Sequence, residues 1–432
     1  MVTWSRWVQS LGSENAFRIG PKIRSIEDTG KKVIKCNLGE PDFPLPRFIK
    51  DEVKRQIDLD NTHYCDPQGI LPLRRAVASY FESTRAIPSD PARVVVFPGA
   101  KPPIGFAQMA YCGPGDEVIY PSPGFPIYES FIASVGAKPV PIHLREDSGF
   151  TLTGAEVEAA MSRRTRLIFL NFPSNPTGGV GTQEQLGQIA EVVLRKGSRD
   201  LRVYSDEVYE HILFDGARHQ SIASFPGMAE RTIVVGGASK SFSWTGGRVG
   251  WALFPTTEEA EVFRNLAINF YSCVPAYNQE GARVGLESPE FAPANRQMVE
   301  AFQARRDLVV EGLRRVEGIT CQMPRGAFYV FPNVAGLCER LGIMEAWRGL
   351  PAATRALTTP STLLQMFLLF EYQVATMDRK SFGRIGTENL HFLRLSIATD
   401  IDSLRTAVDR IAAASRDTAG FQRFVRAGEN LA

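Results

Sequence analysis

Short apolar runs alternate with amphipathic segments between about residue 90 and residue 254. The runs are rich in β-branched residues and end at Gly, Pro, Asn or Asp, which is typical of buried strands. The segments between them space their apolar residues as helices do. This alternation predicts a mostly parallel sheet flanked by helices, in which ligands bind beyond the carboxyl ends of the strands. The predicted strands are 94–97, 117–120, 138–142, 166–170, 201–204, 233–235 and 249–254.

The chain on either side of this region is mainly helical in pattern. Residues 1–35 predict an arm with a short helix, followed by a strand over 33–38. A long helix over 293–316 is predicted to lead into a second domain, whose strands are expected at 320–323, 328–331 and 392–397. We therefore predict an α/β fold in three parts: an N-terminal arm with part of the small domain (1–45), a large domain (46–292) and a smaller α+β domain (293–432).

Composition excludes several functional classes. Acidic and basic residues nearly balance in the 432-residue chain, at a net charge of +2, so neither nucleic acid nor a membrane surface is an expected partner. The N-terminus lacks the pattern of a signal peptide, and the longest apolar run, 363–370, is too short to span a bilayer. Six scattered cysteines are expected to be reduced thiols of a cytoplasmic protein. The five histidines are isolated, so no metal site is expected.

One lysine stands between two of the predicted strands. Lys240 follows the run 233–235 and two glycines, and Arg248 precedes the next run. A lysine at the rim of a buried sheet reaches water, pairs with an anion, or has its pKa lowered. The last state is the one that a Schiff-base lysine requires. A surface lysine beside a surface arginine explains this stretch alone equally well.

Residues suited to one ligand occur at the other strand ends. Backbone amides at a helix start, just before Pro102, form a ready anion site, and an aromatic ring after the next strand can lie against a planar ligand. A strand-end carboxylate can pair with a cationic ring nitrogen. Each residue alone has an ordinary explanation as a cap, a turn or a core residue, but pyridoxal 5′-phosphate requires all of them. The candidates are Gly99, Ala100, Lys101, Phe125, Asn175, Asp206, Tyr209, Ser239, Lys240 and Arg248.

Three motifs carry a family resemblance: SNPTGG at 174–179, DEVYE at 206–210 and SKSFSWTGGRVG at 239–250. NLGEPDF at 37–43, PGAKP at 98–102, FLRLSIAT at 392–399 and the stretch 64–74 are weaker. From about residue 37 to 399 the chain resembles the pyridoxal-phosphate-dependent aminotransferases of fold type I, the class I/II or aspartate aminotransferase family. The resemblance implies a large domain with a mostly parallel sheet, a smaller α+β domain, and a homodimer with shared active sites.

The resemblance also implies a role for each candidate. Lys240 would form the Schiff base and carry the proton of the 1,3-shift. Asp206 would keep the ring nitrogen protonated. Phe125 would stack on the ring, and Tyr209 and Asn175 would bind its oxygen. The phosphate would be held by the turn of Gly99, Ala100 and Lys101, by Ser239 and Arg248, and by Tyr64 of the neighbouring subunit.

The substrate carboxylate has its own candidate. Arg394 lies inside an apolar strand pattern, and a positive charge buried there needs an anionic partner. By resemblance it would grip the α-carboxylate, helped by Asn175 and the backbone near Gly39. The expected reaction moves an amino group between an L-amino acid and a 2-oxo acid.

Some features depart from the family pattern. Gly237 stands where many relatives have serine, segment 336–372 is long, segment 375–388 is unusually charged, and no arginine for a second carboxylate is evident. An alternative is therefore elimination, replacement or C–C bond formation on a specialised substrate such as S-adenosylmethionine, as in 1-aminocyclopropane-1-carboxylate synthases. A ligand-sensing regulator is disfavoured, because no DNA-binding domain precedes the catalytic pattern.

Overall fold

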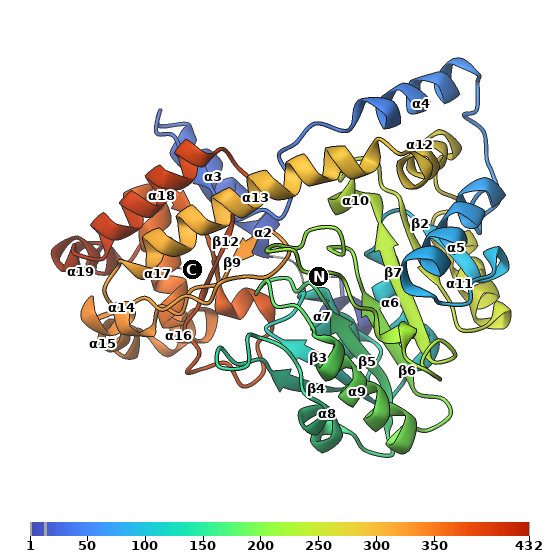
Figure 1. The fold of residues 1–432 in the computed structure, drawn as a ribbon. Helices are drawn as coiled ribbons and strands as arrows, with labels where there is room; N and C mark the ends of the chain where they lie inside the picture. Colours follow the sequence, from blue (N-terminus) through green and yellow to red (C-terminus); the bar gives the residue numbers. More distant parts are fainter. Residues whose placement is uncertain (1, 13–14, 432) are drawn as a thin grey trace.

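The computed structural model describes residues 2–12 and 15–431 and contains a central seven-stranded sheet (Figure 1). Its strand order is β2-β8-β7-β6-β5-β3-β4, and every strand is parallel to its neighbours except β8, which is antiparallel to β2 and β7. The predicted mostly parallel sheet is thereby confirmed. The bounds are β2 Val94–Phe97, β3 Glu117–Ser122, β4 Lys138–His143, β5 Thr165–Asn171, β6 Arg202–Asp206, β7 Thr232–Gly237 and β8 Gly250–Leu253.

Helices cover both faces of this sheet because alternate side chains of each strand point to opposite faces. In β5, Ile168 and Leu170 pack with α8 and α9, whereas Leu167 and Phe169 pack with α6, α7 and α11. Helix α9 begins at a capping box in which Thr182 and Gln185 satisfy each other's free backbone amides. The flanking helices are α4 Arg47–Asp58, α5 Leu71–Arg85, α6 Pro102–Tyr111, α7 Ile127–Ser134, α8 Gly154–Ala160, α9 Gln183–Lys196, α11 Thr257–Phe270 and α12 Ala276–Glu287.

A second hydrophobic core contains residues from both the N-terminal and the C-terminal region of the chain. Ile23, from α3, packs in the same cluster as Phe367 and Ile411. The long helix α13 (Phe291–Arg314) runs from the large sheet toward these C-terminal helices (Figure 1). The predicted domain boundaries after residues 45 and 292 stay predictions. The further elements are α1 Arg6–Ser10, α2 Asn15–Arg18, α3 Gly20–Glu27, α14 Ala335–Arg340, α15 Ile343–Arg348, α16 Ala352–Leu357, α17 Pro360–Tyr372, α18 Ile401–Ala414 and α19 Thr418–Ala427.

Two small sheets complete the second part of the fold. Strand β1 (Ile34–Lys35) pairs with β10 (Val374–Ala375), and β12 (Leu393–Ser396) lies between β11 (Met377–Asp378) and β9 (Tyr329–Val330). Two predicted strands are therefore wrong in extent. Segment 33–38 keeps only two strand residues, and 320–323 contributes only a bridge from Thr320 to Asn333.

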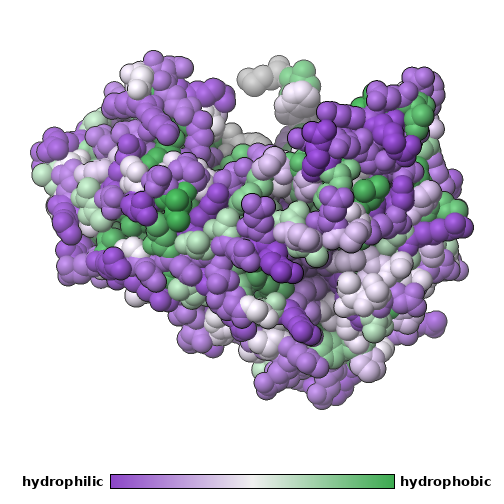
Figure 2. Space-filling view, turned by 45° about the horizontal axis from the view of Figure 1, so that its top comes forward, coloured by the Kyte–Doolittle hydropathy of each residue, from purple (hydrophilic) through white to green (hydrophobic). Residues whose placement is uncertain are grey.

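Within the described ranges, the helices are too short or too polar to cross a bilayer. Hydrophilic residues predominate on the face drawn in Figure 2, and apolar residues lie among them in small groups. Even the apolar helix α17 is an interior element, because its residues from Pro360 to Leu369 are all buried.

Candidate active site

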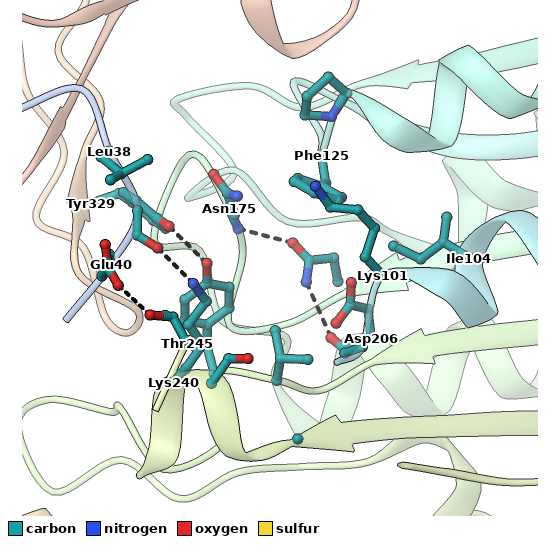
Figure 3. Close-up of a pocket in the computed structure, with 18 of the residues that line it drawn as sticks. Leu38, Glu40, Lys101, Ile104, Phe125, Asn175, Asp206, Lys240, Thr245 and Tyr329 are labelled. Carbon is teal, nitrogen blue, oxygen red and sulfur yellow. Dashed lines mark hydrogen bonds between the residues drawn. The ribbon is translucent and has the colours of Figure 1, made fainter. Parts of the chain in front are cut away.

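A cavity of about 430 Å³ lies where β5, β6 and β7 end and the second part of the fold begins (Figure 3). Its walls bring together residues that are far apart in the sequence, from Asn15 to Arg394. The predicted site residues that line it are Gly39, Ala100, Lys101, Phe125, Asn175, Asp206, Tyr209, Ser239, Lys240, Arg248 and Arg394. Gly99 lies just behind this wall, and Tyr64 lies elsewhere.

Lys240 enters the cavity from α10 (Ala238–Ser241), a single helical turn that directly follows β7. Its Nζ donates a hydrogen bond of 2.6 Å to the backbone oxygen of Gly39 and lies 5.9 Å from the ring centres of Tyr209 and Phe328 (Figure 3). The amine is thus held among an amide oxygen and aromatic faces. These contacts hold the amine at the cavity wall, within reach of a ligand in the cavity.

Asp206 ends β6 and is buried, with 5% of its surface exposed. Tyr128 donates a 2.7 Å hydrogen bond to Oδ2, whereas Oδ1 is buried and accepts no hydrogen bond from the described residues. Asn171, its register partner on β5, donates to the Asp206 backbone oxygen at 3.2 Å. A buried carboxylate oxygen that lacks a donor, on the wall of a cavity, fits a cationic ring N–H of a ligand.

Asp206 also gives a pH-dependent prediction for the cofactor-free protein. Burial raises the pKa of Asp206 from 3.8 to about 6, against the opposing effect of the Tyr128 hydrogen bond. Because the folded-state pKa is the higher one, the protonated carboxyl favours folding below about pH 4, and this contribution is lost as the pH rises through about 6. Asp206→Asn stays neutral, so we expect it to raise the free energy of unfolding at about pH 8 by about 3 kcal/mol.

Urea unfolding of the cofactor-free wild type and of Asp206→Asn, between about pH 4 and pH 8, measures the difference in their free energies of unfolding. The stabilisation should vanish near pH 4, where Asp206 is protonated in both states. A difference that stays constant with pH would instead show that the carboxylate is not destabilised by its burial.

Arg394 belongs to β12, in the second part of the fold, and its buried side chain lines the cavity. Its Nη1 donates to Asn175 Oδ1 at 3.0 Å and its Nη2 to the Asn37 backbone oxygen at 2.5 Å. Its guanidinium lies 4.5 Å from the ring centre of Tyr329. Amide oxygens and an aromatic face orient the guanidinium at the cavity wall, in a geometry that suits a carboxylate ligand.

Tyr209 faces the same space from the turn after β6. Its hydroxyl lies 2.7 Å from that of Tyr329, and burial raises the pKa of Tyr209 well above its ordinary value. The phenol is therefore neutral and can donate to a ligand oxygen. Asn175 completes this side of the cavity: its backbone amide donates to Asn171 Oδ1 at 2.9 Å.

The remaining wall presents an anion-binding turn. Lys101 is the N-cap of α6 and Pro102 its first residue, so the helix start offers backbone amides. Arg248 is fixed over this turn by hydrogen bonds to the backbone oxygens of Pro98 (3.0 Å) and Thr245 (2.7 Å). Gly99 has φ +85°, and a Cβ there would overlap the Arg248 guanidinium. Glycine at 99 therefore allows the arginine to approach the turn.

The family model for aminotransferase class I and II matches residues 31–411 of the chain. The chain belongs to this family. An aspartate aminotransferase of Rhizobium meliloti (strain 1021) is 34% identical over 94% of this chain and 95% of its own length. An aspartate/prephenate aminotransferase of Cereibacter sphaeroides is 36% identical over 91% and 93%.

Solved structures agree with the fold. The aspartate aminotransferase from Rhizobium meliloti superposes with a TM-score of 0.86 at 32% identity, covering 96% of this chain and 99% of that one. The Thermus thermophilus enzyme with maleate gives 0.83 at 29% identity, over 96% and 100%. The fold type I architecture is thereby confirmed, and the protein is a pyridoxal-phosphate-dependent transferase that moves amino groups.

Tyr64 is the one predicted site residue that lies away from the cavity of this aminotransferase. It is on the loop between α4 and α5, and 90% of its surface is exposed. The prediction that it reaches the site of a neighbouring subunit stays a prediction.

The charged segment 375–388 supplies a cavity wall that the sequence did not reveal. Ser381 and Phe382 line the cavity, and Asn15 from the N-terminal arm donates to Ser381 Oγ at 3.0 Å. Arg379 points the other way: it is 1% exposed and donates to Ser122 Oγ, at the end of β3, at 2.8 Å. Burial lowers the pKa of Arg379 to about 10, although nearby Glu129 opposes this shift, so the guanidinium remains charged at neutral pH.

A second buried group of charges supports the backbone next to Asp206. Arg85 at the end of α5 donates to Glu207 at 2.9 Å and pairs with Glu210, and His219 lies 2.8 Å from Glu207. Burial alone would raise the pKa of Glu207, but His219 and Arg85 lower it to about 2. The two glutamates of the DEVYE motif therefore anchor the strand end rather than face the cavity. Tyr128 and Asn171, which contact Asp206, carry no motif of their own and were not predicted.

Proposed function

We propose that this aminotransferase binds pyridoxal 5′-phosphate in the cavity, with Lys240 as the residue of covalent attachment. The observation that carries the proposal is that Lys240, the donor-less Asp206 Oδ1 and the oriented Arg394 guanidinium surround one space. The amides near Ala100, with Ser239 and Arg248, are the proposed phosphate ligands. The bound cofactor supplies an aldehyde for attachment and a ring that accepts electrons from the substrate α-carbon.

The side chains around that space have distinct proposed tasks. Lys240 Nζ would remove the α-proton of the substrate and deliver it to the aldehyde-derived carbon of the cofactor, which requires the amine to be neutral for part of the cycle. Arg394 fixes the α-carboxylate, so that the proton points toward Lys240. Asp206 keeps a positive charge on the ring nitrogen, and Tyr209 and Asn175 donate to the ring oxygen.

We further propose that the enzyme works as a homodimer. Tyr64, Leu59 and Phe270 are large apolar or aromatic side chains that are exposed at 90%, 61% and 56%, and burial of such surface favours association. Burial of such residues against a second copy would bring Tyr64 to the partner's phosphate site. Analytical ultracentrifugation of the wild type measures whether the protein sediments as a dimer. Tyr64→Ala should weaken cofactor retention without unfolding the subunit.

The expected cytoplasmic location is also proposed. The described cysteines are free thiols, which supports it.

The proposed substrates are an L-amino acid and a 2-oxo acid, with a dicarboxylic acid as one of the pair. Several relatives at 32–36% identity are named aspartate or aspartate/prephenate aminotransferases, and one at 32% is named an aromatic-amino-acid aminotransferase. Four cationic side chains line the cavity, counted over the described residues, and three of them have proposed roles at Lys240, Arg248 and Arg394. The fourth is Lys101, whose Nζ lies 5.6 Å from the ring centre of Phe125. We assign Lys101 to the distal carboxylate, a role for which no arginine was identified in the sequence.

Lys101→Met tests this assignment. Loss of one hydrogen bond between charged groups should raise KM for aspartate or glutamate about tenfold or more, and leave KM for phenylalanine unchanged. Steady-state kinetics with both substrate types measure the difference. Lys31→Met removes a remote exposed lysine and is the matched control. Equal losses for both substrates would place Lys101 at the cofactor rather than at the distal carboxylate.

The reaction type is tested by absorbance of the holoenzyme with a panel of L-amino acids. Amino-group transfer converts the cofactor to its amine form, and a 2-oxo acid then restores the original spectrum. A spectrum that never reaches the amine form, but changes on addition of S-adenosylmethionine, would instead support the alternative chemistry of elimination or ring closure.

A further inference from the structure

Tyr329 reaches the cavity from the second part of the fold and has no task in the function proposed above. It belongs to β9, is buried and lines the cavity (Figure 3). Its register partner on β12 is Ser396, two residues after Arg394. Residues two apart in a strand share one face of a sheet, and so do partners across a ladder. Tyr329 and Arg394 therefore lie on the same face of the small sheet.

The hydroxyl of Tyr329 contacts the large domain. It lies 2.7 Å from the hydroxyl of Tyr209, and the two rings meet edge to face with their centres 5.7 Å apart. The same hydroxyl packs against the Cα of Gly39, where a Cβ would overlap it. The backbone oxygen of Gly39 accepts the 2.6 Å hydrogen bond from Lys240. The Tyr329 hydroxyl thus connects the two parts of the fold beside the residue that holds the Lys240 amine.

The ring of Tyr329 has a separate contact. Its centre lies 4.5 Å from the central carbon of the Arg394 guanidinium, and the centre of the Phe382 ring lies 4.8 Å from the same carbon. An aromatic face attracts a cation most strongly where water is excluded, and all three side chains are buried. Tyr329 therefore contacts a proposed cofactor ligand, Tyr209, and a proposed substrate ligand, Arg394, through different atoms.

The direction of the bond between the hydroxyls follows from the proposed function, on which this inference rests. Distance alone allows either oxygen to be the donor. Tyr209 has one O–H, and the proposed function directs it to the ring oxygen of the cofactor. Tyr329 is then the donor to the Tyr209 oxygen. A donor at that oxygen polarises the O–H of Tyr209 and strengthens the next hydrogen bond in the chain.

We propose that Tyr329 is a positioning residue for amino-group transfer, with two separable tasks. Its hydroxyl strengthens the hydrogen bond that Tyr209 donates to the cofactor. Its ring holds the Arg394 guanidinium in the geometry that binds the substrate α-carboxylate. Asp206 and Lys240 are also close to Tyr209, and the variants that test these tasks leave both of them, and Arg394, in place.

Tyr329→Phe tests the hydroxyl, because phenylalanine keeps the ring. The readout is the pH midpoint at which the visible band of the lysine-bound cofactor changes, measured by absorbance of the holoenzyme. A hydrogen bond that stabilises negative charge on the ring oxygen lowers the pKa of the proton shared between this oxygen and the lysine nitrogen. Tyr209→Phe should therefore raise the midpoint by about 1 to 2 pH units, and Tyr329→Phe by about 0.3.

The double variant distinguishes action through Tyr209 from direct action on the cofactor. Tyr209→Phe combined with Tyr329→Phe should have the midpoint of Tyr209→Phe alone, because no Tyr209 hydroxyl is left to polarise. Tyr372→Phe removes a hydroxyl that donates to Asp417 outside the cavity, and this matched control should keep the wild-type midpoint. A wild-type midpoint in Tyr329→Phe, or additive shifts in the double variant, would overturn the task of the hydroxyl.

Tyr329→Leu tests the ring. Loss of a buried contact between a cation and an aromatic face should raise KM about tenfold for aspartate and phenylalanine alike, because both carry the α-carboxylate. Tyr329→Phe should keep the wild-type KM for both. Circular dichroism checks the fold, and Tyr329→Met replaces the leucine variant if the latter does not fold. A wild-type KM without the aromatic ring would overturn the task of the ring.

Failure of this inference differs from failure of the proposed function. A wild-type protein that shows no visible band after incubation with pyridoxal 5′-phosphate would refute cofactor attachment at Lys240, and with it the role of Tyr329. A normal wild-type band with a midpoint that shifts in Tyr209→Phe but not in Tyr329→Phe would leave the proposed function intact and refute only the coupling through Tyr329.

Discussion

Lys240→Ala is expected to abolish amino-group transfer, with kcat reduced by about 10⁴-fold or more. The substitution removes both the amine that attaches the cofactor and the base that moves the α-proton. The fold should persist, because Lys240 lies on the single helical turn α10 at the cavity wall rather than in a hydrophobic core cluster. Steady-state kinetics measure the loss of activity. The visible absorbance band reports the attachment of the cofactor to lysine, and circular dichroism reports the fold.

Lys240→Arg separates the positive charge of the side chain from its ability to lose a proton. Arginine keeps the positive charge and the hydrogen bond to Gly39 but does not become neutral in proteins, so it should lose activity as fully as the alanine variant. Lys32→Ala, at a remote exposed position, should retain both activity and the band. A lysine-type band that persists in Lys240→Ala would contradict the assignment of Lys240.

Asp206→Asn is expected to lower kcat by about 10²- to 10³-fold, the range for removal of one electrostatic stabiliser from an active site. Asparagine preserves the shape and can still accept from Tyr128, but it cannot hold the proton on a ring nitrogen. The same substitution should stabilise the cofactor-free protein at neutral and basic pH. The buried carboxylate of Asp206 therefore lowers the free energy of unfolding of the cofactor-free protein while it raises kcat.

Measuring kcat and the free energy of unfolding on the same preparation of Asp206→Asn distinguishes a catalytic role of Asp206 from a purely structural one. Tyr128→Phe removes only the hydrogen bond at Oδ2 and should cost kcat far less than Asp206→Asn. An Asp206→Asn enzyme with the wild-type kcat would place the positive charge of the reaction elsewhere in the cavity.

The sequence predicted the strand-end residues because of a property of parallel sheets. Polar residues that end neighbouring parallel strands lie at one edge, and Asn171 and Asp206 are in fact register partners. Each of the seven predicted strands of the large sheet occurs, since each is a short β-branched run between turn residues. Lys240 and Arg248 are found at the cavity for the same reason, because they belong to the connection between β7 and β8.

The contacts that close the cavity were not predictable from local patterns. Asn37, Tyr329 and Ser381 reach the cavity region only because the two parts of the chain dock against each other, and periodicity within one segment does not encode docking. The bounds of helix α17 were not predicted, for a related reason. It is buried on all sides along most of its length, so it lacks the apolar stripe that marks an amphipathic helix.

The anchoring of segment 375–388 bears on how specificity can be redesigned. Ser381 and Phe382 form a cavity wall, but the same segment is tied to the large sheet through Arg379 and Ser122, and through the Arg384 amide, which donates to Glu129. Transplanting 375–388 alone into a relative would bury a guanidinium opposite a foreign β3 end, which is costly. The exchangeable unit for chimeric enzymes is therefore the segment together with Ser122 and Glu129, and libraries that vary the wall should hold those two positions fixed.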